Sequence, residues 1–214
     1  MRQIFLTMTL TWLVAAGGAV FAQGTDTTFV DGTHYTSLPK QEPTITNDGT
    51  IEVAEIFAYS CPHCMNFEPA IEHWLTTKPD YITFVRIPAP WGDPISDVHA
   101  KGFYTAEILG KLDEMHPAFF KEFHERGNRL ATEDAMREMF ARFDVDAETF
   151  DETFNSFAVH NSLQRARDLM RRYQVMETPI VIVNGKYQSR GVQAGNYGTW
   201  FSIIEHLAER ENAD

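Results

Sequence analysis

The chain has 214 residues, of which 43% are hydrophobic and 22% charged, a composition typical of one folded domain that needs no disulfide support for its core. Its formal net charge is -12 at pH 7, so electrostatics favour neither nucleic acid nor an anionic membrane as a partner. The sequence contains no basic run, internal repeat or low-complexity tract.

The first 22 residues are predicted to be a cleavable secretory signal peptide. One basic residue, Arg2, precedes an apolar stretch over about residues 10–20, and Val20-Phe21-Ala22 places small residues where a signal peptidase cleaves. An uncleaved anchor is the alternative, because residues 4–21 could just cross a bilayer. The break at Gly17-Gly18 favours the signal peptide, and export would place the chain in an oxidising compartment.

Two strands and one helix are predicted after this segment. Residues 23–50, rich in Thr, Asp, Gly and Pro, indicate an extended lead-in with one short edge strand near residues 34–37. Residues 51–59 are almost continuously apolar, which predicts a buried central strand. A helix is expected from Pro62, a residue suited to a first helical position, to about Thr77. A second strong strand is expected over residues 81–87.

Helical spacing of apolar residues dominates from about residue 94 to residue 174. Three stripes in this block are expected to pack in the core rather than to bind a cofactor. The stripes are Met136, Met139, Phe140 and Phe143; Phe150, Phe154 and Phe157; and Val159, Leu163, Ala166, Met170 and Tyr173.

A hairpin and a last helix complete the predicted chain. Asn184-Gly185 separates the apolar run 180–183 from residues 186–188, and this dipeptide favours a tight turn in which both residues take positive φ. A final helix is expected over about residues 197–209. The order β-α-β, helical block, β-β-α predicts an α/β fold whose single sheet is interrupted by an all-helical insertion at about residues 94–174.

Both cysteines of the chain lie in the motif Cys61-Pro62-His63-Cys64. Structural zinc usually needs a second pair of Cys or His ligands, which the sequence does not offer, so no metal site is predicted. A loop this short would also gain little stability from a disulfide. A redox couple fits better, because cysteines at i and i+3 of a helix start lie within disulfide distance.

Cys61 is the cysteine expected to ionise. It sits where free backbone amides and the helix dipole stabilise a negative charge. His63 should lower the pKa of Cys61 further, as a donor or a positive charge, although an exposed histidine with no role is the alternative. A stabilised thiolate favours the dithiol form, which makes the disulfide a stronger oxidant.

Glu55 is predicted to be buried close to these cysteines. Strand alternation places it on one face with Ile51, Val53, Phe57 and Tyr59, as the single acid on an apolar face. Burial should raise the pKa of the carboxyl and let it exchange protons with a nearby thiol. The alternative is an edge residue that reaches solvent.

Taken together, several motifs resemble the DsbA family, the periplasmic thiol:disulfide oxidants of Gram-negative bacteria. The motifs are the 61–64 sequence after a hydrophobic strand, Thr178-Pro179 before a late strand, the 183–187 hairpin, and Phe154-Asn155-Ser156-Phe157 in the helical block. The resemblance covers about residues 31–206. It implies a thioredoxin fold with a helical insertion.

The resemblance also implies roles for individual residues. Cys61 would be the exposed nucleophile within the catalytic motif that includes Pro62, and Cys64 its buried partner. Pro179 would be cis and face the cysteines, and Thr178 would offer backbone hydrogen bonds to an extended substrate.

Glu55 matches the buried acid that the family carries six residues before its first cysteine. Some members place a lysine in the second strand near this acid. Here the best match is apolar, at about Phe84, and Arg86 is the nearest basic residue. This departure puts the proton relay in question more than the redox chemistry.

For function, the resemblance implies a monomeric periplasmic oxidase that acts on unfolded exported proteins with free thiols. It would need no cofactor or metal beyond the Cys61-Cys64 disulfide, and a membrane quinone-linked partner of the DsbB type would reoxidise it. Two alternatives stay open. One is a reductase or isomerase of the same fold, and the other is a non-enzymatic metal-binding or chaperone-like module.

Overall fold

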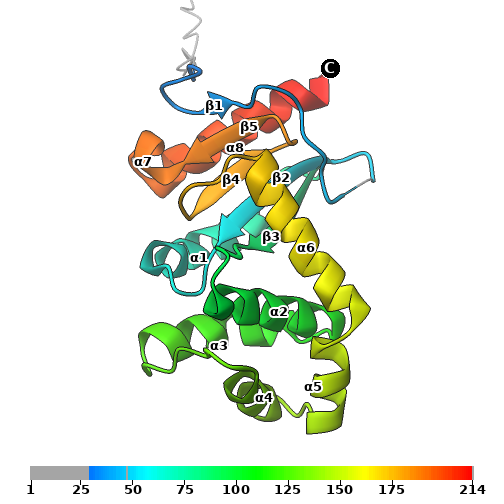
Figure 1. Ribbon diagram of the computed structural model, residues 1–214. Helices are drawn as coiled ribbons and strands as arrows, with labels where there is room; N and C mark the ends of the chain where they lie inside the picture. The colour runs from blue at the N-terminus through cyan, green and yellow to red at the C-terminus, as the bar shows by residue number, and fades with distance from the viewer. Residues whose placement is uncertain (1–28, 47, 214) are drawn as a thin grey trace, which may run out of the picture.

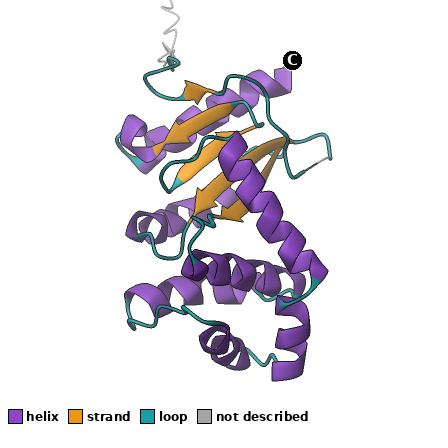
Figure 2. Cartoon of the chain, in the orientation of Figure 1, coloured by secondary structure: helices purple, strands orange, loops and turns teal. Residues whose placement is uncertain are grey.

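The computed structural model describes residues 29–46 and 48–213, so the predicted signal peptide lies outside the described residues. A five-stranded mixed sheet with the order β1-β5-β4-β2-β3 forms its centre (Figures 1 and 2). The strands are β1 (Thr36–Ser37), β2 (Ile51–Phe57), β3 (Ile82–Pro88), β4 (Ile180–Val183) and β5 (Tyr187–Arg190). β2, β3 and β4 lie where the apolar runs predict them, and β5 follows the predicted turn at Asn184-Gly185.

Helices divide into those packed on the sheet and those of an inserted block. α1 (Pro62–Leu75), α7 (Gly191–Ala194) and α8 (Tyr197–Ala213) belong to the first group. Between β3 and β4 come α2 (Pro94–Ile108), α3 (Leu112–His124), α4 (Glu133–Ala141), α5 (Ala147–Phe154) and α6 (Phe157–Arg172). Figure 1 shows this block below the sheet, with α6 running back toward it. The α/β fold with an all-helical insertion is thus confirmed. None of the helices in residues 29–46 and 48–213 has the length and apolarity to span a membrane.

β2 is an interior strand between β4 and β3, and all seven of its residues are buried. It pairs in parallel with β3 and antiparallel with β4. Near-continuous apolar sequence is what a strand covered on both faces requires. Because β3 precedes the helical block and β4 follows it, the two ends of the block flank the strand that leads to the cysteines.

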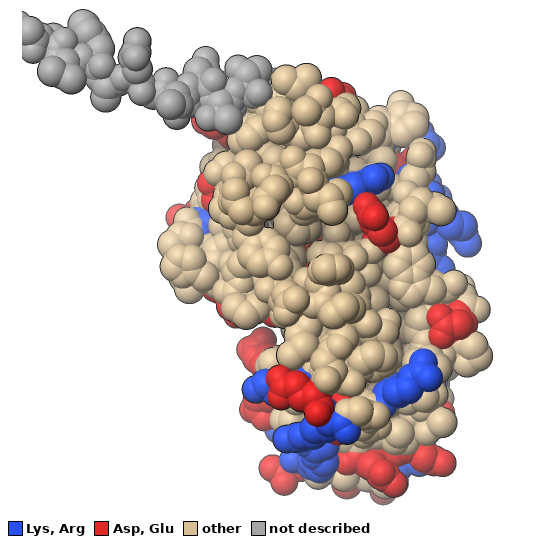
Figure 3. All heavy atoms as spheres, turned by 90° about the vertical axis from the view of Figure 1, so that its left-hand side faces the viewer, with Lys and Arg blue, Asp and Glu red and all other residues tan. Residues whose placement is uncertain are grey.

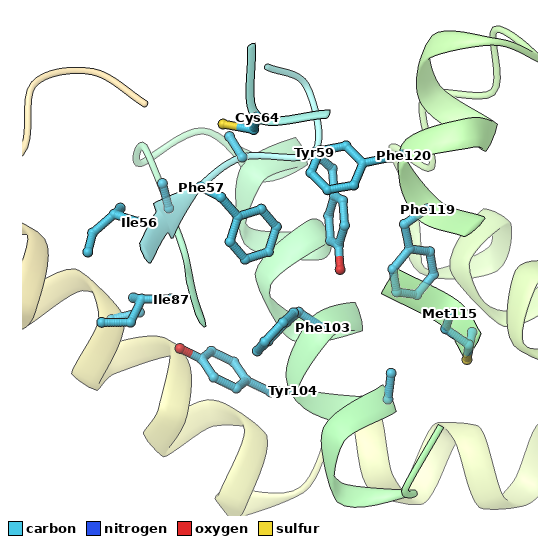
Figure 4. Packing of buried hydrophobic residues seen from close by; sticks show 14 of the residues in the cluster. Ile56, Phe57, Tyr59, Cys64, Ile87, Phe103, Tyr104, Met115, Phe119 and Phe120 are labelled. Atoms are coloured by element: carbon cyan, nitrogen blue, oxygen red, sulfur yellow. The ribbon is translucent and has the colours of Figure 1, made fainter. Parts of the chain in front are cut away.

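Two hydrophobic clusters lie on opposite faces of the sheet. On one face α1 and α8 meet, and the ring of Phe67 stacks on Trp200 at a centroid distance of 4.3 Å. On the other, the helical block buries Phe57, Phe103 and Phe120 against the ends of β2 and β3. Figure 4 shows Tyr59 among these aromatic rings and the sulfur of Cys64 near the edge of the cluster. Burial of this apolar surface is the main force that joins the block to the sheet.

The predicted stripes are confirmed except at two phenylalanines. Phe157 is 85% exposed, because it is the first residue of α6, directly after the N-cap Ser156, and points away from the buried face of that helix. Phe143, in the turn after α4, is only partly buried. The short helix α7 was not predicted, since four residues carry no periodic signal.

Candidate active site

The two cysteines occupy the first turn of α1. Cys61 is the N-cap residue, with extended backbone, and its sulfur accepts a hydrogen bond of 3.3 Å from the backbone amide of Cys64. Pro62 follows at the first helical position, where a missing amide hydrogen costs nothing. Cys61 is partly exposed and Cys64 is fully buried. Only one of the two sulfurs is therefore open to attack by another molecule.

The environments of the two thiols move their pKa values in opposite directions. Hydrogen bonding to Cys64, which outweighs burial, lowers the pKa of Cys61 to about 5, with further help from Thr178 and from the backbone amide of His63. Burial, followed by the neighbouring Cys61, raises the pKa of Cys64. The pair therefore ionises at Cys61 and keeps its proton at Cys64.

A loop far along the chain lies beside Cys61. The peptide bond between Thr178 and Pro179 is cis, as the resemblance implies. The carbonyl oxygen of Thr178 lies 3.3 Å from the sulfur of Cys61 and accepts a hydrogen bond from the thiol. The predicted substrate-binding residues and the cysteines are thus brought together in one place.

A cavity of about 630 Å³ opens beside this loop. Its lining includes Thr178, Pro179, Val192 and Tyr197, together with His63, which is exposed. Figure 3 views the side of the molecule that carries α1 and α7, where a broad area has few charged residues, whereas charges gather over the far end of the helical block. On a chain with a net charge of -12, such an area suits a partner bound through apolar contacts.

Glu55 is fully buried in β2, as predicted. Desolvation by burial raises the pKa of Glu55 well above its usual value, and the charge of Glu68 raises it further. Parallel pairing sets Arg86 of β3 opposite Glu55, and the Nε atom of Arg86 lies 3.6 Å from Glu55 Oε2. Phe84, the suggested match for the basic position, pairs with Val53 instead. Register thus identifies Arg86 as the basic neighbour of the buried acid.

Sequence reasoning missed three further residues of this site. Glu68 and Glu72 of α1 approach the guanidinium of Arg86, and His116 of α3 approaches Glu68. The spacing of Glu68 and Glu72 at i and i+4 could have indicated a shared helix face. His116 had no such signal, because it belongs to a different part of the chain.

Within residues 29–46 and 48–213, no group of three or more His, Cys, Asp or Glu side chains is arranged to hold a metal ion. His63, which lies between the two cysteines in sequence, is not part of any such group and lines the cavity beside Thr178.

Comparison with known proteins agrees with this geometry. Residues 94–197 match the family described as "DSBA-like thioredoxin domain". The thiol:disulfide interchange protein DsbA of Pseudomonas aeruginosa is 38% identical over 213 residues, covering 100% of this chain and 98% of that protein. The chain belongs to the DsbA family.

Other DsbA proteins support the same assignment. DsbA of Azotobacter vinelandii is 34% identical over 206 residues, covering 94% of this chain and 95% of that protein. The crystal structure of Pseudomonas aeruginosa DsbA superposes with a TM-score of 0.81 at 37% identity, covering 86% of this chain and 95% of that chain. As a member of the DsbA family, the protein is a thiol:disulfide oxidoreductase with a thioredoxin-like fold.

Proposed function

We propose that this DsbA-family protein works as an oxidant, donating a Cys61-Cys64 disulfide to unfolded, newly exported proteins that carry free thiols. The difference in ionisation between the two cysteines supports this direction. Because the pKa of Cys61 is lowered to about 5, the reduced protein gains free energy at neutral pH that the disulfide form does not. A protein that favours its own dithiol passes its disulfide on.

The reaction proceeds in two exchange steps. A substrate thiolate attacks the Cys61 sulfur, a mixed disulfide forms, and the Cys61-Cys64 bond breaks with its electron pair on Cys64. A second substrate thiolate then attacks the substrate sulfur of the mixed disulfide and releases Cys61 as a thiolate. The substrate loses two electrons to the protein. In the second step Cys61 is a better leaving group than an ordinary cysteine, because its lowered pKa makes its thiolate more stable.

Glu55 is the proposed proton donor for Cys64. The Cys64 thiolate is formed in a buried site that raises its pKa, so it must take up a proton. Burial raises the pKa of the Glu55 carboxyl well above its usual value and so favours its protonated form, while the ionised form would repel the thiolate of either cysteine. A neutral acid below the disulfide can therefore supply the proton without admitting water.

The cavity beside Thr178 is the proposed substrate site. An extended peptide can bind along the backbone of Thr178 as an added strand, while apolar side chains enter the cavity. Backbone contacts and an apolar lining give broad specificity, which suits an oxidase of many substrates. His63, at the edge of this cavity, would contact the bound chain.

We propose that the protein acts in the periplasm, where exported, unfolded substrates are found, and that the predicted signal at residues 1–22 directs it there. A membrane quinone-linked protein of the DsbB type is the proposed reoxidant, and it would use the same cavity. We propose that the protein works as a monomer, without metal or organic cofactor.

The test is the reduction potential of the protein in glutathione buffers, together with oxidation of a reduced, unfolded substrate. We expect a strongly oxidising potential and stoichiometric transfer of one disulfide. A potential as low as that of cytosolic thioredoxin would contradict the oxidase assignment. Refolding of scrambled ribonuclease without added oxidant would indicate an isomerase instead.

A further inference from the structure

Three carboxylates share one guanidinium beneath the disulfide site. Arg86 Nη2 lies 2.8 Å from Glu68 Oε2 and 2.9 Å from Glu72 Oε1. Glu55 faces only the Nε atom of Arg86, at 3.6 Å, and neither of its carboxyl oxygens has a hydrogen-bond partner among the described residues. The closest contacts of Arg86 are therefore with the two carboxylates of α1. Arg86 balances a negative charge on Glu55 only in part.

A histidine from the helical block holds the other side of Glu68. The Nε2 atom of His116 lies 3.1 Å from Glu68 Oε1, a close contact without hydrogen-bond geometry, while its Nδ1 atom is hydrogen-bonded to the hydroxyl of Tyr59 at 2.9 Å. His116 is 5% exposed and Tyr59 is 1% exposed. The imidazole thus connects the loop that follows β2 with α1, entirely inside the protein.

The two contacts determine where the proton of a neutral imidazole must lie. Burial lowers the pKa of His116, more than the nearby Glu68 raises it, so the ring is neutral at pH 7. With its proton on Nε2, the ring turns a partial positive charge toward the Glu68 carboxylate and accepts a hydrogen bond from Tyr59 at Nδ1. No other tautomer of the neutral ring serves both neighbours.

We propose that His116 is a positioning residue for the exchange reaction, because it holds Glu68 against Arg86 and so leaves Glu55 protonated beneath Cys64. In this arrangement Glu68 is the charged partner of Arg86, and Glu55 can remain uncharged. The inference rests on the proposed proton donation by Glu55. It adds that the helical insertion, through His116, maintains the protonation state of that acid.

The effect of removing His116 follows from the charges that meet here. Burial raises the pKa of Glu68, but contact with His116 and then the charge of Arg86 outweigh it, and the net pKa is lowered. Without the imidazole the pKa of Glu68 rises. Each proton that Glu68 then takes up removes a negative charge that repels Glu55 and weakens the hold of Glu68 on Arg86, so the pKa of Glu55 falls.

The groups that act most strongly on this titration, among the described residues, come from four elements and one loop. They are Glu68 and Glu72 with Cys61 and Cys64 on or at the start of α1, Arg86 on β3, Glu55 on β2, His116 on α3, and Tyr59 in the loop after β2. His99 of α2 also packs on the ring of Tyr59. Its Nε2 atom lies 2.8 Å from the carbonyl oxygen of Arg129, and the carboxylate whose charge acts on it is Asp93 rather than Glu55 or Glu68.

Infrared difference spectroscopy of the reduced full-length protein tests the proposal, with the protonated carboxyl band that Glu55→Gln removes as the readout. We expect the midpoint pH of this band to fall by about one unit in His116→Leu, the size of shift typical when a charged neighbour within ~4–6 Å is altered. His116→Gln retains a side-chain N–H donor and should restore most of the midpoint. Tyr59→Phe, which keeps the ring, should give a smaller decrease.

His99→Leu is the matched control, since His99 is equally buried at 5% exposure and touches the same tyrosine. It should leave the midpoint unchanged. An unchanged midpoint in folded His116→Leu, or equal decreases in both leucine variants, would overturn the proposal, as would a parent protein without the band. If His116→Leu does not fold, an unchanged midpoint in Tyr59→Phe overturns it. The readout needs no substrate, so failure of the oxidase assignment in the glutathione assay is a separate result.

Discussion

The sulfur of Cys61 lies 3.3 Å from the carbonyl oxygen of Thr178, although 117 positions separate the two residues in the chain. The thiol form of Cys61 donates to this oxygen, whereas the thiolate cannot. Ionisation of Cys61 therefore removes this donor and frees the Thr178 carbonyl for another one. A substrate backbone N–H is the donor that strand addition would bring.

Substitution of each cysteine by serine should separate their roles. Cys61→Ser should abolish disulfide transfer, because the buried Cys64 cannot be reached by a substrate. Cys64→Ser should form a mixed disulfide at Cys61 that accumulates, because no second cysteine is present to resolve it. Mass spectrometry after reaction with a peptide that carries a disulfide distinguishes the two, because the Cys61 thiolate of Cys64→Ser attacks that disulfide, keeps one half of the peptide and releases the other as a thiolate. Accumulation of the peptide on Cys64 in Cys61→Ser would contradict the assignment.

The stability of the reduced protein should depend on pH through Cys61. Its folded pKa of about 5 lies below that of an unfolded thiol, at ~8.5. The stabilisation is therefore complete above the unfolded value, decreases as pH falls, and is lost below about 5. We expect the free energy of unfolding of the reduced form, relative to the oxidised form, to rise by about 1–2 kcal/mol from pH 5 to 7, allowing for solvent screening of a half-exposed group. Urea unfolding of both forms measures it, and a constant difference would contradict the lowered pKa.

Glu55→Gln should change how stability varies with pH. A carboxyl whose folded pKa is raised contributes stability that is complete below the unfolded pKa and is lost as pH rises through the folded pKa. Glutamine does not ionise, so it avoids this loss. We expect the Tm of the variant, relative to the parent, to increase by about 2–4 °C between pH 5 and 8, equivalent to ~1 kcal/mol for a domain of this size. Parallel Tm curves would show that Glu55 does not titrate in this range.

A charge placed in the cavity beside Thr178 should weaken substrate binding. Val192 lines this cavity and is 84% exposed, so Val192→Glu should fold normally. We expect kcat/KM for an unfolded substrate to fall about tenfold, a loss of ~1.4 kcal/mol, with most of the change in KM. Ile108→Glu, a change at an exposed apolar residue outside the cavity lining, is the matched control. An equal loss in both variants would mean that surface charge in general, and not the cavity, is responsible.

The β4–β5 turn should tolerate no side chain at Gly185. Its φ is +63°, and an added Cβ would overlap the carbonyl oxygen of Glu42, whose amide donates to the carbonyl of Gly185. Gly185→Ala should therefore lower the free energy of unfolding by at least about 2 kcal/mol. Gly49→Ala, also at positive φ but with nothing within 4 Å, should cost only about 1 kcal/mol. Thermal unfolding of both variants makes the comparison.

Much of this fold could be predicted because its elements carry local signals. The run at residues 180–183 is strongly apolar, and Asn184 and Gly185 do adopt positive φ, at 49° and 63°. Phe157 shows the limit of such patterns. It continues the spacing of Phe150 and Phe154, yet the chain turns at Ser156 between α5 and α6, so the stripe does not continue.

The site was only partly predictable, because its chemistry depends on distant contacts. Burial of Glu55 follows from its strand, but its neighbours Glu68 and Arg86 depend on strand register and helix placement. The cis bond at Pro179 was predicted from the family resemblance alone. His63 acts on the pKa of Cys61 through its backbone amide, a contribution of chain geometry that the identity of the side chain does not reveal.

The position of the helical block in the chain also governs when the sheet can form. β2 is completed by residue 57, but its antiparallel neighbour β4 begins only at residue 180. During synthesis from the N-terminus, the segment with both cysteines therefore emerges well before the strand that closes the sheet beside it. Such long-range pairing slows folding, so for that interval the nascent oxidant presents its own thiols uncovered, like those of the proteins it is proposed to oxidise.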